Sequence, residues 1–210
     1  MEKIQFPRLP DTVLLHIFGY LDDSKTLLDL DKSGDYSDQL SRVAADKTLW
    51  RKIRIKHIKS KQDLKRFTSK LSKNTKSISI EAFKYKSHNK KVELSYSFLS
   101  SIKLHCTHLT SLTLKHFQLS WLQWHLFNLP STLTHLSLHG CDLTDLPSIR
   151  GKINSPIYSL RKRMINVTLL DLCECKWVKP CDLLAASHWK SLKKIILPSD
   201  EDHEVTHDAV

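Results

Sequence analysis

The first fifty residues carry apolar side chains at the spacing of short helices. Between residues 10 and 24, apolar side chains recur at positions 14, 17, 18 and 21, which is the spacing of one helix face. Pro10 and Asp11 suit the start of this helix, and the polar run 22–24 suits its end. Further apolar groups at 27–30 and 40–43 flank a polar break at 32–35, and Asp46 to Trp50 follows. The pattern predicts a compact unit of three short helices.

A unit of this size needs something to pack against. About 45 residues bury too small a fraction of their surface to be stable alone, so we expect the unit to lean on a partner or on the next domain. Two interpretations of the first helix stay open at this point. Leu14, Ile17, Phe18 and Leu21 are core residues in one, as in most amphipathic helices, and contacts to another protein in the other.

From residue 50 onward the apolar pattern repeats. The segment Leu133 to Leu143 fits the leucine-rich repeat pattern L-x-x-L-x-L-x-x-N/C-x-L at every position. Similar copies cover 109–119 and 167–177, a partial copy starts at Leu192, and two degenerate copies are centred on 53–55 and 78–80. The equivalent positions 53, 78, 112, 136, 170 and 195 are 25, 34, 24, 34 and 25 residues apart, and the two long steps imply inserted loops. We therefore expect an α/β fold, in which the three helices precede a short solenoid with a curved parallel sheet and helices or loops outside it.

Segments between the repeats can carry the outer helices. Ser60 and Asp63 have the spacing of a capping box ahead of apolar residues at 64, 67 and 71. Residues 98–104 and 181–186 are short helix candidates as well. These three segments are where we expect helices between the strands.

Alternation along each predicted strand separates an inward face from an exposed one. Leu112 and Leu114 project inward, and the neighbouring residues project to the other side. A curved array of such strands offers a broad concave platform to another protein, although a plain solvated sheet face has the same pattern. The candidate protein-binding residues on this face are Lys115, His135, Ser137, His139, Asp171 and Cys173.

The N-terminal residues resemble those of the F-box family over about residues 5–53. The resemblance rests on the order Leu9-Pro10, Leu14, Ile17-Phe18, Leu21, Leu27-Leu28 and Asp46-x-x-Leu49-Trp50. It implies docking onto a Skp-type adaptor, which sits on a cullin with its RING subunit in an SCF ubiquitin ligase. The middle departs from the family pattern, since residues 36–40 read Tyr-Ser-Asp-Gln-Leu where the family usually has Val-Cys, two basic residues and Trp. The adaptor-facing residues that the resemblance implies are Leu9, Pro10, Leu14, Ile17, Phe18, Leu21 and Leu28.

An F-box followed by leucine-rich repeats resembles the F-box/leucine-rich-repeat substrate receptors. The resemblance implies a non-catalytic subunit that binds a protein substrate through its repeats. The expected organisation is an F-box at 5–53, with Trp50 at the joint, leucine-rich repeats at 54–198, and an acidic, disordered tail at 199–210. The repeat count is low for that family, and no C-terminal cap is evident.

The charge of the chain changes this picture only locally. The net charge is +11, but residues 47–91 alone hold 16 Lys and Arg against 2 Asp and Glu. That segment lacks zinc-finger, homeodomain and aromatic RNA-recognition signatures, so we do not expect nucleic acid to be the partner. It is a candidate for recognising an acidic or phosphorylated substrate. The alternative function is a leucine-rich-repeat interaction protein outside any ligase, whose basic segment binds acidic protein or nucleic acid.

Resident chemistry is not expected. Cys173, Cys175, Cys181 and His188 do not have common zinc-site spacing, and Cys175 is explained by the repeat as an inward residue. With 4 Gly in the chain, and with no nucleophile elbow or phosphate-binding loop, we predict neither a catalytic site nor a cofactor or metal. The absence of a long apolar segment and the odd count of 5 cysteines lead us to expect no membrane contact and a location in cytoplasm or nucleus.

Overall fold

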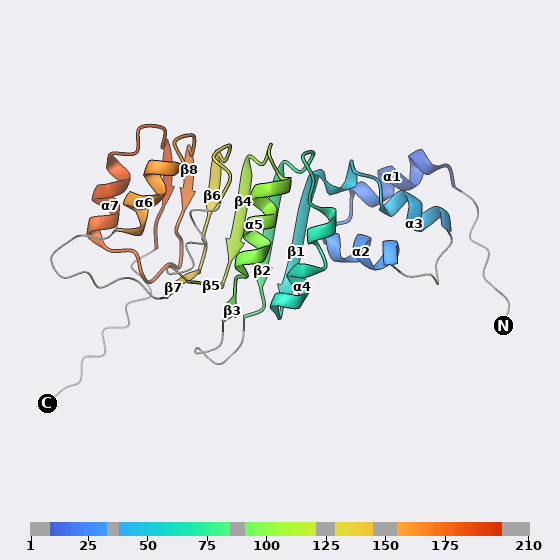
Figure 1. Cartoon of the computed structure of the whole chain (residues 1–210), viewed down its shortest axis with the longest axis horizontal. Helices are drawn as coiled ribbons and strands as arrows, with labels where there is room; N and C mark the ends of the chain where they lie inside the picture. Colours follow the sequence, from blue (N-terminus) through green and yellow to red (C-terminus); the bar gives the residue numbers. More distant parts are fainter. Residues whose placement is uncertain (1–8, 33–37, 85–90, 121–128, 145–154, 199–210) are drawn as a thin grey trace, which may run out of the picture.

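The computed structural model describes residues 9–32, 38–84, 91–120, 129–144 and 155–198. Helices from the N-terminal end lie at one end of the molecule, and the strands follow side by side toward the C-terminal end (Figure 1). The predicted acidic tail at 199–210 and the atypical residues Tyr36 and Ser37 lie outside the described residues. Within the described ranges, none of the helices has both the length and the hydropathy that a bilayer crossing requires.

Three short helices form the N-terminal module, as the spacing predicted. They are α1 (Asp11–Gly19), α2 (Ser24–Lys32) and α3 (Asp38–Ala44), and the 3-10 turn η1 (Leu49–Arg51) follows. Each contributes side chains to one small core, which consists of Leu14, Phe18, Leu27, Leu28, Val43, Ala44 and Trp50. This core is continuous with that of the sheet, so the module rests on the next part of the chain.

A six-stranded parallel sheet follows the module. Its strand order is β1-β2-β4-β6-β8-β9, so the strands follow one another across the sheet in the order in which they occur along the chain. The strands are β1 (Lys52–Ile58), β2 (Ser77–Ala82), β4 (Ser111–Lys115), β6 (His135–Ser137), β8 (Leu169–Asp171) and β9 (Lys194–Ile196). Ile53, Ile78, Leu112, Leu136, Leu170 and Ile195 pair across these strands in one continuous column. These are the six equivalent positions of the sequence alignment, so the parallel sheet and its register are confirmed.

A second, three-stranded parallel sheet was not predicted. It consists of β3 (Val92–Glu93), β5 (Phe117–Ser120) and β7 (Asp142–Thr144). The chain turns from β4 into β5 at His116 and from β6 toward β7 at Gly140, and both residues have a left-handed backbone. Glu174, after β8, is left-handed as well. Each lies four residues after the paired column, and the same is true of His57 at the end of β1. The strands β1, β4, β6 and β8 therefore share a left-handed residue at the same position relative to the paired column.

Short helices lie between the strands, most of them at or near the predicted places. They are α4 (Lys61–Lys65), the 3-10 turn η2 (Thr68–Lys70), α5 (Tyr96–His105), α6 (Pro156–Arg163) and α7 (Pro180–Ser187). The expected capping box is present at α4, where the Ser60 hydroxyl accepts from the Asp63 backbone N–H. Helix α6 was not predicted. Its N-terminus is capped by the Ser155 side chain, and Pro156 opens its first turn.

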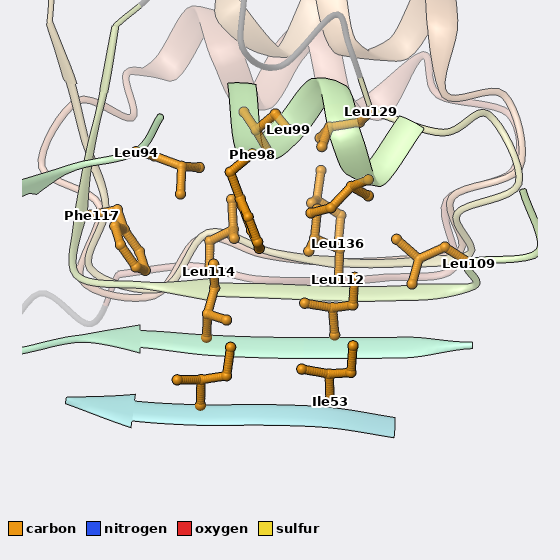
Figure 2. Packing of buried hydrophobic residues seen from close by; sticks show 14 of the residues in the cluster. Ile53, Leu94, Phe98, Leu99, Leu109, Leu112, Leu114, Phe117, Leu129 and Leu136 are labelled. Atoms are coloured by element: carbon orange, nitrogen blue, oxygen red, sulfur yellow. The ribbon is translucent and has the colours of Figure 1, made fainter. Parts of the chain in front are cut away.

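The hydrophobic core lies between the strands and these helices. Figure 2 shows Phe98 and Leu99 of α5 above Leu112 and Leu114 of β4. All four side chains are fully or almost fully buried. Two cysteines take part in the same packing, because the Sγ of Cys141 donates to the Leu114 carbonyl and that of Cys175 to the Leu138 carbonyl. Burial raises the pKa of Cys175 to about 12, so both the position and the chemistry are those of an inert core thiol.

Candidate functional site

An exposed apolar stripe runs along α1. Leu9, Val13, Ile17 and Leu21 follow one another at intervals of four residues and all are exposed, with 46% of the surface of Ile17 accessible. Tyr20 adds an aromatic ring beside them and is more exposed still. Aliphatic and aromatic side chains grouped on one helix face are the anchors by which helices dock on other proteins. This stripe is the first candidate site.

Side chains from α3 fix the start of α1. The Gln39 Nε2 donates to the Leu9 carbonyl at 2.7 Å and to the Asp11 carboxylate at 2.7 Å. Arg42 adds an ion pair to the other oxygen of Asp11 at 2.8 Å. The Gln39 hydrogen bond, followed by the charge of Arg42, holds the pKa of Asp11 below its usual value. One of the residues that departs from the F-box pattern is therefore the residue that positions the first turn of α1.

Three of the seven predicted adaptor contacts are core residues. Leu28 has no accessible surface, and Leu14 and Phe18 are buried as well. In the free protein these three side chains therefore lie inside the module, and their contact with an adaptor stays a prediction. The three side chains pack inward and belong to the core that holds the three helices together. Phe18 also lines an open groove of about 430 Å³ together with Leu21 and Leu49.

The remaining four predicted contacts are on the surface. Leu9, Pro10, Ile17 and Leu21 are all exposed, and the first, third and fourth belong to the stripe. Val13 and Tyr20 lie with them and were missed. The sequence did signal Val13, because Leu9, Val13, Ile17 and Leu21 follow one another every four residues beside the buried pair Leu14 and Phe18.

Direct bonds join the helical module to the sheet. Trp50 is buried at this junction, where its indole N–H donates to the Ala44 carbonyl at 2.9 Å and its carbonyl accepts from the Thr75 hydroxyl. The Ser24 hydroxyl, at the start of α2, accepts from the Arg54 backbone N–H at 2.9 Å. These bonds span both sides of the junction, so the expected place of Trp50 at the joint agrees with the structure.

The predicted protein-binding face of the sheet is partly engaged in bonds of its own. Ser137 was expected on the exposed face, but it is buried and its hydroxyl donates to the Asp171 carboxylate at 2.7 Å. The same carboxylate accepts from the Cys173 backbone N–H at 3.0 Å. The prediction that Ser137 is exposed is therefore wrong. The polar side chains of neighbouring strands form hydrogen bonds with one another on this face of the sheet.

His135, Lys115 and Cys173 keep accessible surface on that face. His135 is exposed and its Nδ1 lies 2.8 Å from the Thr134 hydroxyl. Lys115 pairs in register with Glu81, and both are half-buried. At the N-terminal edge of the same face, Lys52, Arg54 and Lys56 are exposed along β1. Part of the basic excess is thus a row of cations on the first strand.

His139 is the candidate whose surroundings the sequence did not indicate. Its Nε2 donates to the Glu174 carboxylate at 3.1 Å, and the buried ring of His116 lies 5.3 Å away, measured between ring centres. Lys84 also reaches Glu174, at 3.4 Å. Burial, with Lys84 beside it, lowers the pKa of His116 to about 4, so its ring is neutral at pH 7. Partial burial opposes the ionisation of Glu174, but the surrounding cations outweigh it and hold the pKa of that carboxyl below its usual value.

The N-terminal module has a recognisable family. The search of curated proteins found no match to this chain. Residues 6–56 match the family model described as F-box-like, and this range contains α1, α2, α3 and most of β1. An F-box-like domain implies binding to a Skp-type adaptor, and the exposed stripe on α1 lies inside the matched range. The chain therefore begins with an F-box-like domain followed by a parallel α/β sheet.

Proposed function

We propose that the protein is the substrate-recognition subunit of an SCF-type E3 ubiquitin ligase. The F-box-like module binds the Skp-type adaptor, which connects it to a cullin and a RING subunit, and the sheet binds a protein substrate. The observation that carries the proposal is the exposed stripe on α1 within the F-box-like range. The protein itself supplies no chemistry in this role, since tethering raises the local concentration of substrate lysines near the ubiquitin carrier.

We further propose that the sheet is a short leucine-rich-repeat array. Support comes from the column of six paired aliphatic residues and from the inward Cys141 and Cys175, which occupy the same position of successive repeats. The solvent-facing side of the array presents exposed cations on β1 and the exposed His135 on β6. We assign substrate binding to this side, with Lys115, His135, Asp171 and Cys173 as the remaining candidates.

The test is assembly with purified Skp-type adaptor, cullin and RING subunit. The informative variant is Ile17→Asp combined with Leu21→Asp, because both side chains are exposed in the free protein and their replacement spares the core. The matched control is Leu104→Asp, which puts the same charge on an exposed leucine of α5, outside the F-box-like range. We expect co-elution of wild type and control with the complex, and loss of co-elution for the double variant. Failure of the folded wild type to bind the adaptor would refute the proposal.

The alternative is an interaction protein that acts outside any ligase, with the β1 cations binding nucleic acid or an acidic protein. Lys52, Arg54 and Lys56 are the observation that favours it. Phosphate contacts by lysine and arginine give binding that weakens steeply with salt. Tight, salt-dependent binding to an unrelated RNA or DNA, together with full tolerance of the double α1 variant, would favour this alternative.

A further inference from the structure

The corners at the ends of β4, β6 and β8 bring together side chains from three successive repeats. His116 and Glu174 occupy the same repeat position, both in left-handed conformation, and Gly140 occupies that position in the repeat between them. A Cβ atom at residue 140 would lie 2.3 Å from the Nδ1 of His116. Because glycine leaves this space free, the imidazole of His116 can approach the carboxylate that comes from two repeats further on. His139 reaches the same carboxylate from the residue before Gly140.

The three side chains have the separations of a metal-ligand set. The Nε2 of His139 is 3.1 Å from one oxygen of Glu174, and the Nδ1 of His116 is 3.9 Å from the other. All three candidate ligand atoms lie within 4.8 Å of one another. Tetrahedral Zn²⁺ with bonds of about 2.0–2.1 Å places its ligand atoms about 3.3 Å apart. Small side-chain rotations therefore suffice to bring the three atoms onto one ion.

The chemistry of the set is also that of zinc. Two imidazoles and one carboxylate are a common three-ligand combination for this ion, with the fourth position left to water. His116 is nine-tenths buried and contributes its ring in the neutral form that binds metals, while Glu174 is half-exposed and gives access from solvent. Within the described ranges, this group brings three possible ligands together, whereas the cysteines considered from the sequence do not form such a group.

A lysine already supplies positive charge at this place. Lys84 lies 3.4 Å from Glu174, and 62% of its side chain is exposed, so it can leave without breaking the core. The Glu174 carboxylate is thus paired with an exposed ammonium group that a metal ion would replace. We propose that His116, His139 and Glu174 form a three-ligand Zn²⁺ site that clamps three successive repeats of the sheet.

The experiment is metal titration of the full chain after treatment with a chelator. Zn²⁺ binding is measured by calorimetry, and Co²⁺ is used as the probe of geometry, since its visible absorption distinguishes tetrahedral from octahedral coordination. We expect one tight site with a tetrahedral Co²⁺ spectrum. His139→Ala and Glu174→Gln should each weaken binding about 100-fold or more, because each removes a direct ligand. Lys84→Gln should tighten binding several-fold, because it removes the competing ammonium.

The chain has 12 histidines, and two control variants separate the site from those outside it. His135→Ala and His188→Ala remove exposed imidazoles outside the cluster and should leave the affinity unchanged. Circular dichroism in chelator verifies that each variant is folded, and Zn²⁺ should raise the melting temperature of the wild type but not of Glu174→Gln. Equal affinity of wild type, His139→Ala and Glu174→Gln overturns the proposal, and so does the absence of a tight site in the wild type.

Discussion

Leu28 and Ile17 give opposite predictions, because one fills the core of the helical module and the other projects from it. Leu28 has no accessible surface, so Leu28→Ala removes three carbon atoms from a closed core. Leucine-to-alanine changes at such sites cost about 2–5 kcal/mol of unfolding free energy. For a chain of this size, about 3 kcal/mol corresponds to a fall in melting temperature of about 6–12 °C. The variant that still folds retains its exposed stripe and should bind the adaptor with the wild-type affinity.

Ile17→Ala should weaken adaptor binding and leave the stability of the fold nearly unchanged. Since 46% of the residue is already exposed in the free protein, its removal changes the unfolding free energy little. Docking would bury the exposed half, and burial of a whole isoleucine side chain is worth about 1.5–3 kcal/mol. About 1 kcal/mol is then lost on binding, which weakens the adaptor affinity about fivefold.

The assay pairs thermal denaturation with calorimetric titration of the purified adaptor at a temperature where both variants are folded. We expect Leu28→Ala to lower the melting temperature and leave the adaptor affinity unchanged. Ile17→Ala should weaken the adaptor affinity and leave the melting temperature unchanged. A Leu28→Ala variant with an unchanged melting temperature and weakened adaptor binding would refute this reasoning, because Leu28 would then be a contact residue.

Three further predictions concern the remaining contacts. Gln39→Ala should speed hydrogen exchange at the amides of Val13 and Leu14, which bond the Pro10 carbonyl, since it removes the bonds that fix the first turn of α1; unchanged exchange there would contradict this role. Gly140→Ala should cost about 2–4 kcal/mol in urea denaturation, because its φ of +61° disfavours a side chain and the added Cβ overlaps His116; a cost below that of an ordinary surface change would argue against the tight corner. In metal-free protein, the stability should fall as the pH drops from about 6.5 to about 4, by up to about 3 kcal/mol, because the unfolded state binds a proton on His116 that the folded state does not. His116→Asn should show a smaller fall over that window, and an equal fall would assign the effect to other groups.

The paired column of the sheet was predictable because its signal is repeated. Leu112, Leu136 and Leu170 stand in the same local pattern, and burial of one fixes the face of all. The helix starts at α4 and α7 were predictable for a different reason, since a cap or a proline acts on its own turn alone. Local and repeated signals of this kind need no knowledge of distant contacts.

The division of α1 between core and surface was not predictable from the same evidence. Positions 14, 17, 18 and 21 lie within one helix face, but 14 and 17 are about 60° apart around the axis. That face is wide enough for one edge to pack inward and the other to project outward, and the packing of α2 and α3 decides which edge does which. The cluster of His116, His139 and Glu174 could not be predicted from the sequence for a related reason. His116 and Glu174 are 58 positions apart, and what unites them is the left-handed corner, which no apolar pattern marks.

The hydrogen bonds of Trp50 and Ser24 hold the sheet in a fixed position relative to the helical module. The distance of each strand from the module is therefore fixed as well. Neighbouring strands lie about 4.8 Å apart, and five such steps separate β1 from β9. A protein held at β9 therefore lies about 24 Å farther from the helical module than one held at β1. Because the junction keeps the module and the sheet together, the strand to which a substrate binds determines the distance between the lysines of that substrate and the protein bound at α1.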